Sequence, residues 1–276
     1  AELDECGVCN GNGVDAGHVR IYDYVNGNWT QVGDDIDGEA EDDRSGGSVS
    51  MSSDGFRLAI GATYNNGNGN KSGHVRVYSI STEPEIFQPQ TKTDLQTAVD
   101  LWVSNNASAL STYGPINGWD VSLITDMSEL FRDKTTFNDD ISSWDVSNVT
   151  NMSFMFKSAE SFNQDLLDWD VSSVTNMRAL FMRASDFSGD LSNWDVSSVT
   201  DMVSMFSWTP FNGDLSSWDV SSVTYMFSMF FNADNFNGDI SNWDVSSVID
   251  MVQMFYGTDD FAGDLSNWDV SSVTTM

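Results

Sequence analysis

The sequence predicts an α/β solenoid of repeats of about 25 residues over residues 113–276, preceded by an all-β module over residues 17–80. Two internal repeats carry this expectation. Seven tryptophans, each followed by aspartate and valine, succeed one another at spacings of 25, 25, 25, 24, 25 and 25 residues, and "GHVRIY" returns as "GHVRVY" 56 residues later. A fixed period of this kind is typical of repeat architectures, in which stacked neighbours bury a shared core. The last repeat is incomplete.

The remaining residues divide by composition. Residues 1–16 are rich in glycine, asparagine and cysteine and predict an extracellular linker, and "STEPEIFQPQ" marks a second linker over residues 81–90. Residues 91–112 predict a helical cap, because Leu95, Ala98, Val99 and Trp102 have the spacing of one helix face, with Thr93 as the N-cap. Such a cap would cover the first repeat of the solenoid.

Within one repeat, two patterns predict a short strand followed by a short helix. The first pattern has the L-x-x-L-x-L spacing of a leucine-rich repeat, and the second begins at a possible helix cap, Thr175, and continues at helical spacing. The sequence class is therefore an α/β leucine-rich-repeat solenoid. The apolar positions of the two patterns are Leu166, Trp169 and Val171, then Met177, Leu180 and Phe181.

The repeat motif W-D-V-S-x-V-T-x-M-x-x-M-F resembles that of the BspA-like leucine-rich-repeat surface proteins. The resemblance runs from about Leu95 to Met276. It implies a secreted or cell-surface solenoid, often associated with adhesion, with no known enzymatic activity and no catalytic residue to carry over.

The all-β module predicts four antiparallel strands and a copy of the first, which is the pattern of a propeller blade and the start of the next. The stretch "SVSMSSDGFRLAIGATYNNGNGNKSGHVRVY" is similar to FG-GAP, integrin-like propeller repeats. The two histidines, His18 and His74, occupy the same slot of this internal repeat and are expected to be structural.

The charge balance excludes several classes of partner. The chain has 42 acidic against 11 basic residues, a net charge of -31, with no lysine or arginine after Arg183. Such a surface repels nucleic acid and anionic lipid and attracts cations or basic partners. The sequence contains no run of 18 or more apolar residues, so no membrane-spanning helix is predicted. With no nucleophile and base in a recognisable pattern, we expect no enzyme.

Two cysteines, Cys6 and Cys9, lie in "DECGVCNGNG". Neither a helix start nor a βαβ unit is predicted there, which disfavours a redox site. We expect a structural disulfide, or pairing with cysteines further upstream.

The aspartate beside each tryptophan forms what we call the first aspartate row. Period-two alternation is expected to turn it away from the core, onto the exposed face of a sheet, where neighbours would repel by about 0.9 kcal/mol per pair in water. Hydrogen bonds from the serine two residues on, partial protonation, or bridging divalent cations such as Ca²⁺ could each offset this repulsion. As a candidate metal site the row comprises Asp120, Asp145, Asp170, Asp195, Asp219, Asp244 and Asp269.

A second aspartate row lies five residues before the first, beside Asn-Gly turns, and is expected to cap turns rather than to bind metal. Its members are Asp140, Asp165, Asp190, Asp214, Asp239 and Asp264. The acidic loop "GDDIDGEAEDD" at 33–43 lacks the ligand spacing of an EF-hand, which leaves a solvated turn or a looser calcium loop.

Five N-x-S/T sequons would accept N-linked glycans if the chain enters a eukaryotic secretory route. They begin at Asn28, Asn70, Asn106, Asn148 and Asn151.

Together these features predict an extracellular or cell-surface protein of structural or adhesive type, whose acidic solenoid face binds a protein or glycan. The alternative is a subunit of a self-assembling filament or appendage, completed by other copies of itself and stabilised by calcium.

Overall fold

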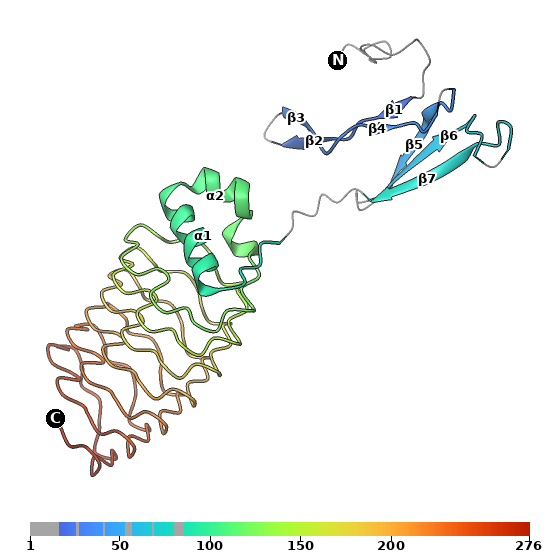
Figure 1. Cartoon of the computed structure of the whole chain (residues 1–276). Helices are drawn as coiled ribbons and strands as arrows, with labels where there is room; N and C mark the ends of the chain where they lie inside the picture. Colours follow the sequence, from blue (N-terminus) through green and yellow to red (C-terminus); the bar gives the residue numbers. More distant parts are fainter. Residues whose placement is uncertain (1–16, 26–27, 41, 53–56, 68, 80–85) are drawn as a thin grey trace. The chain divides into compact units, whose positions relative to one another are not determined.

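The computed structural model describes residues 17–25, 28–40, 42–52, 57–67, 69–79 and 86–276. The chain divides into two compact units, Ala1–Glu85 and Ile86–Met276, which Figure 1 shows in blue to cyan and in green to red. Each unit has an apolar cluster of its own.

The first unit consists of short antiparallel strands (Figure 1). Strand β1 pairs with β4, β2 pairs with β3, and β5, β6 and β7 form a three-stranded sheet in that order. The strands are β1 (His18–Val19), β2 (Tyr22–Val25), β3 (Asn28–Gln31), β4 (Ile36–Asp37), β5 (Ser45–Met51), β6 (Arg57–Ala62) and β7 (His74–Ser79).

The propeller-blade prediction for this unit is wrong. The described strands form three small sheets instead of one four-stranded blade, and β7, the copy of the first strand, pairs with β6 rather than opening a second blade. Among the described residues of this unit, Leu58 and Ile60 of β6 form the buried cluster, against partly buried neighbours such as Ile36 and Tyr78. The described apolar contacts thus centre on β6 and support a small three-stranded sheet instead of a broad blade.

The second unit begins with α1 (Lys92–Ser104), α2 (Asn106–Tyr113) and the 3₁₀ turn η1 (Ile116–Gly118). The N-cap of α1 is Thr91 rather than the expected Thr93, and it forms a capping box with Asp94. The four apolar side chains of the helix stripe, Leu95, Ala98, Val99 and Trp102, are buried.

Helix α1 satisfies polar groups of the first repeat. Gln96 Nε2 donates to the carbonyl oxygen of Leu130 at 3.1 Å, and Lys92 Nζ lies 3.2 Å from Asp126. Trp102 Nε1 donates to Asp139 at 2.9 Å. The helix therefore caps backbone and side-chain groups that a preceding repeat would otherwise pair.

From η1 onward the chain winds into stacked coils of about 25 residues, which follow one another in sequence order below α1 (Figure 1). We number them from the Ile or Leu that precedes each tryptophan by three residues. Single parallel bridges join neighbouring coils, for example Asn151 with Asn176. Coils 1 to 7 are 116–140, 141–165, 166–190, 191–214, 215–239, 240–264 and 265–276.

The prediction of an α/β leucine-rich-repeat solenoid is wrong. Residues 119–276 contain neither a helix nor a strand longer than a single bridge, so no coil has a strand and a helix. Each coil is instead a series of turns closed by bonds between residues three apart: Trp169 N–H to Leu166 O, Val174 N–H to Val171 O, and Leu180 N–H to Met177 O. The apolar spacing of three that suggested a helix comes from these turns.

Left-handed residues explain why no helix forms. Ala179 and Arg183 of coil 3 have φ of 51° and 60°, which interrupts any right-handed helix there. The N–H groups of Met177, Ala179 and Phe181 donate to carbonyls of coil 4, at 2.9, 2.7 and 3.0 Å, instead of to residues four earlier. Hydrogen bonds between coils thus replace hydrogen bonds within a helix.

Aromatic columns run through the core of the coil stack. Within coil 3 the rings of Phe181 and Phe187 stack at 3.9 Å, and Phe181 stacks on Phe156 of coil 2 at 5.5 Å. The tryptophans form a further column, with Trp194 and Trp218 parallel at 6.5 Å. These side chains are almost fully buried and supply much of the apolar area that holds the coils together.

Candidate functional site

The first aspartate row is held by local hydrogen bonds. In coil 3, Asp170 Oδ1 accepts from the backbone N–H of Ser172 at 3.1 Å and from its hydroxyl at 2.6 Å. This is an Asx turn, in which a side chain folds the backbone two residues on. The same backbone bond recurs at Asp120, Asp145, Asp195, Asp219, Asp244 and Asp269.

Each of these aspartates makes a corner of its coil. Trp169 and Val171 on either side of Asp170 are buried, at 3% and 1% exposure, whereas Asp170 is exposed. The expected outward direction is therefore found, but the expected sheet is not, because Asp170 starts a turn instead of lying within a strand. The carboxylates point to solvent from successive corners of the stack.

Hydrogen bonds from serine favour the ionised form of six carboxylates of this row. The Ser172 hydroxyl, followed by the Ser172 backbone N–H, holds the pKa of Asp170 below its ordinary value. Ser197 lowers the pKa of Asp195 in the same way, and the charge of Asp170 raises it by less. Lowered pKa values for the same reason are found at Asp120, Asp219, Asp244 and Asp269. Local hydrogen bonds therefore outweigh repulsion along the row.

The row offers few ligands to a metal ion. Over the described ranges, no group of three or more His, Cys, Asp or Glu side chains is arranged to hold one. At this corner each coil contributes one aspartate, and its Oδ1 already accepts from serine. The donor set does not fit Ca²⁺, which takes six to eight oxygens. The calcium assignment of the row thus stays a prediction without a built site.

The second aspartate row also consists of turn-forming side chains. Asp190 Oδ1 accepts from Ser192 N–H at 2.9 Å, and Asp165 accepts from Leu167 N–H at 2.9 Å. The backbone N–H and then the hydroxyl of Ser142 lower the pKa of Asp140. Equivalent backbone bonds are made by Asp214, Asp239 and Asp264.

A third corner was missed by sequence reasoning. Asn176 Oδ1 accepts from Arg178 N–H at 3.0 Å, and Asp201 Oδ1 accepts from Val203 N–H at 3.0 Å. These residues also make the parallel bridges between coils. The signal was present as an Asp or Asn before the first methionine of most repeats, but its variation hid the common role.

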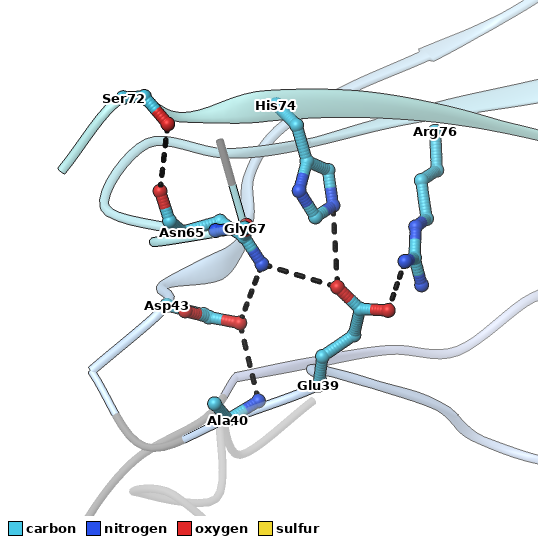
Figure 2. Close-up of polar contacts among 8 residues, drawn as sticks. All are labelled: Glu39, Ala40, Asp43, Asn65, Gly67, Ser72, His74 and Arg76. Carbon is cyan, nitrogen blue, oxygen red and sulfur yellow. Dashed lines mark hydrogen bonds and ion pairs between the residues drawn. The ribbon is translucent and has the colours of Figure 1, made fainter. Parts of the chain in front are cut away.

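The first unit contains one buried carboxylate among its described residues. Asp43 is 1% exposed, and its Oδ2 accepts from Asn65 Nδ2 at 2.8 Å and from Ala40 N–H at 3.1 Å (Figure 2). Its Oδ1 has no hydrogen-bond partner in the described part of the chain. Asp43 therefore fastens the acidic loop to the β6–β7 connection.

Two acidic side chains of this loop, Glu39 and Asp35, are paired with cations. Glu39 bonds Arg76, accepts from Asn65 Nδ2 at 3.2 Å and lies 3.9 Å from His74 (Figure 2). The pKa of Glu39 is lowered, chiefly by its hydrogen bond with Arg76. Asp35 pairs with Arg20 at 2.9 Å. Arginine and asparagine side chains thus hold the loop in place. A calcium ion bound in this loop stays a prediction.

The sequons differ in access. Asn28, Asn70 and Asn106 are exposed, and Asn148 is exposed but donates its amide to Ser122 O at 3.0 Å. Asn151 is half-buried at a bridge, with its Oδ1 bound by Ser153 N–H. Glycosylation stays a prediction at all five. Cys6 and Cys9, with the disulfide expected there, lie outside the described residues.

A family model matches most of the coil region. Its description reads "Mycoplasma protein of unknown function, DUF285", and it matches residues 101–210 and 190–276, which together exceed half of the chain. The chain belongs to the DUF285 family. No curated protein and no solved structure matches this DUF285 chain.

The DUF285 match assigns no activity, since its description gives the function as unknown. It does not test the resemblances to BspA-like and FG-GAP proteins, which stay predictions. Within the described ranges, no helix has both the length and the apolar character that crossing a bilayer requires.

Proposed function

We propose that this DUF285 chain is a non-enzymatic structural or adhesive protein of the cell surface or extracellular space. Its first aspartate row would hold a basic protein or glycan. The observation that carries the proposal is the row itself: carboxylates on successive coils, each bonded by the serine two residues on, which at Asp170 and Asp195 lowers the pKa.

The first aspartate row is preorganised to receive cations. A carboxylate already fixed by two hydrogen bonds loses little conformational freedom when a cation approaches. Repetition at each coil places like charges in a line, which raises the local concentration of cations. A partner with several ammonium or guanidinium groups would engage several coils at once and gain avidity without any tight single contact.

The experiment uses two cationic probes, immobilised poly-lysine and immobilised chitosan oligosaccharide. We expect the 276-residue chain to bind at low ionic strength and to release as NaCl rises from about 20 mM to about 300 mM, where screening shortens the reach of surface charge. Failure to bind either probe at low salt would contradict the proposal.

A further inference from the structure

Every lysine and arginine of the coils lies on one side of each coil. The five residues come from segments that begin at the first methionine of a repeat and span eight residues: 127–134, 152–159 and 177–184. The corresponding segments of coils 4 to 6, 202–209, 226–233 and 251–258, contain no charged residue. Glu129 and Asp133 balance the two cations of the coil 1 segment, so this side has a net positive charge at coils 2 and 3 and no charge at coils 4 to 6.

The uncharged half carries exposed aromatic rings. Trp208 and Tyr256 are 49% and 62% exposed. Phe231, which lies between them in the sequence, is half-buried. The Trp208 and Phe231 ring centres are 6.0 Å apart, and Phe231 and Tyr256 stack at 5.1 Å. Exposed aromatic groups in contact with one another are typical of an interaction surface.

Backbone bonds place the two halves on one continuous line. Donor N–H groups of coils 1 to 5 reach carbonyls of the next coil at 2.8 to 2.9 Å, in five successive steps. The steps are Asp133 to Lys157, Ser158 to Met182, Arg183 to Ser207, Trp208 to Phe231 and Asn232 to Tyr256. Two adjacent positions of each coil follow this line: Arg183 and Trp208 are donor residues, whereas Lys157, Phe231 and Tyr256 are acceptor residues, and Arg132 directly precedes the donor Asp133. We call these exposed or half-buried side chains the ridge: Arg132, Lys157, Arg183, Trp208, Phe231 and Tyr256.

The cations of the ridge differ in their partners. Arg183 is exposed, and none of the described residues makes an ion pair with it. Lys157 Nζ lies 5.7 Å from the Phe154 ring centre, and Arg132 lies 6.0 Å from the same ring while also pairing with Glu129 and Asp133. Lys157 and Arg132 already sit at cation–π distance from one aromatic ring.

We propose that the ridge is a self-association surface, on which a second copy of this chain packs antiparallel about a two-fold axis between coils 3 and 4. Each coil contributes one cation or one ring to the ridge. The two-fold axis therefore places Arg183 opposite Trp208 of the second copy. It also pairs Lys157 with Phe231 and Arg132 with Tyr256. The cationic half of each ridge then covers the aromatic half of the other. Such self-complementarity is what an isologous dimer requires.

Charge selects this occupant over others. A polyanion is repelled by the chain's net charge of -31, and a polycation finds many more carboxylates on the aspartate rows than on the ridge. The ridge is also where two copies can meet with the least repulsion, since coils 4 to 6 are uncharged there. A single ridge is a narrow contact, so the dimer is transient rather than obligate.

Sedimentation of the 276-residue chain from about 10 µM to about 1 mM, in about 0.15 M salt, tests the proposal. We expect a reversible monomer–dimer equilibrium. Arg183→Glu and Trp208→Lys should each weaken it at least about tenfold, because each breaks the contact at the axis twice. An equimolar mixture of the two variants should dimerise again. In the mixed dimer the introduced glutamate and the introduced lysine pair at one contact, while the native arginine and tryptophan meet at the other.

Matched controls separate the ridge from general effects. Tyr225→Lys changes an aromatic side chain of similar exposure, 42%, outside the ridge, and should leave the dimer unchanged. Ser173→Glu with Ser198→Glu adds the same negative charge as Arg183→Glu at exposed positions away from it, and should also leave the dimer unchanged. A chain that stays monomeric throughout, one that grows into open polymers, or a mixture that fails to dimerise would each overturn the proposal.

Discussion

The indole Nε1 of Trp194 donates a hydrogen bond of 2.9 Å to the backbone carbonyl oxygen of Leu166, in the preceding coil. Both groups are buried, and the same bond joins Trp169 to Ile141, Trp218 to Leu191 and Trp243 to Leu215. The tryptophan therefore does two things in each repeat: it fills the core, and it donates a second hydrogen bond to a carbonyl oxygen that already closes a turn, as Leu166 O does with the Trp169 N–H.

Replacing Trp194 by Phe keeps an aromatic ring but removes the indole N–H, so the Leu166 carbonyl oxygen keeps only its bond from the Trp169 backbone N–H. One hydrogen bond contributes about 1 kcal/mol net, so we expect a loss of this size in the free energy of unfolding. Denaturant unfolding measures it. Trp208→Phe, at an exposed ring, should change stability by less than about 0.5 kcal/mol. Equal effects at the two positions would contradict the role of the indole bond.

The left-handed positions should tolerate glycine better than a β-branched residue. Ser204 has a φ of 55° and donates its N–H to Phe227 O of the next coil at 2.9 Å. We expect Ser204→Val to be less stable than Ser204→Gly by about 1–2 kcal/mol in denaturant unfolding, because valine resists positive φ. The same pair of substitutions at Ser198, where φ is not positive, should show no such preference for glycine.

These two features mark the boundary of what the sequence could predict. The apolar stripe from Leu95 to Trp102 indicated a helix, and α1 buries those side chains. The spacing of Met177, Leu180 and Phe181 also indicated a helix, but the chain forms turns there. The positive φ of Ala179 and Arg183 prevents a helix in this segment. The sequence does not indicate this conformation, because glycine, rather than alanine or arginine, is the residue that usually adopts it.

The sequence predicted the candidate site best where the hydrogen bonds join residues that are close in sequence. The bond from Ser172 to Asp170 spans two residues and was one of three offsets that the D-V-S pattern left open. The burial of Asp43 depends on Asn65, 22 residues away, and on a fold of the first unit that the repeat pattern did not predict. Acidic composition alone could not separate one buried carboxylate from its exposed neighbours.

Removing the amide of Asn65 should destabilise the first unit alone. Asn65→Ala leaves the buried carboxylate of Asp43 with one donor fewer, which costs about 1.5–3 kcal/mol for a hydrogen bond to a charged group. Because the two units have separate cores, we expect calorimetry to show the lower stability in one transition while the coil transition is unchanged. Asn70→Ala, at an exposed position, is the control. A shift of both transitions would contradict this account.

Acid should destabilise the coils. The folded pKa values of Asp170 and Asp195 lie below their unfolded values, so their stabilisation is complete above the unfolded pKa, about 3.9, and is lost as pH falls through the lowered folded pKa. We expect a constant Tm between about pH 7 and pH 5 and a falling Tm below about pH 4.

Asparagine at these positions keeps the Oδ1 acceptor without the ionisable group. A variant with Asn in place of Asp170, Asp195, Asp219, Asp244 and Asp269 should therefore lose less Tm than the parent between about pH 5 and pH 3, values chosen to bracket the unfolded pKa of about 3.9. Equal losses in the parent and the variant would show that the row does not govern acid sensitivity.

The same variant tests most directly the claim that the first aspartate row, rather than total charge, holds a basic partner. Its comparison is a charge-matched variant with Asn at five exposed aspartates outside both rows: Asp168, Asp186, Asp234, Asp259 and Asp260. Affinity for immobilised poly-lysine is the measurement. The account predicts a loss of at least about tenfold for the row variant and a much smaller loss for the matched variant. Equal losses in the two variants would contradict it.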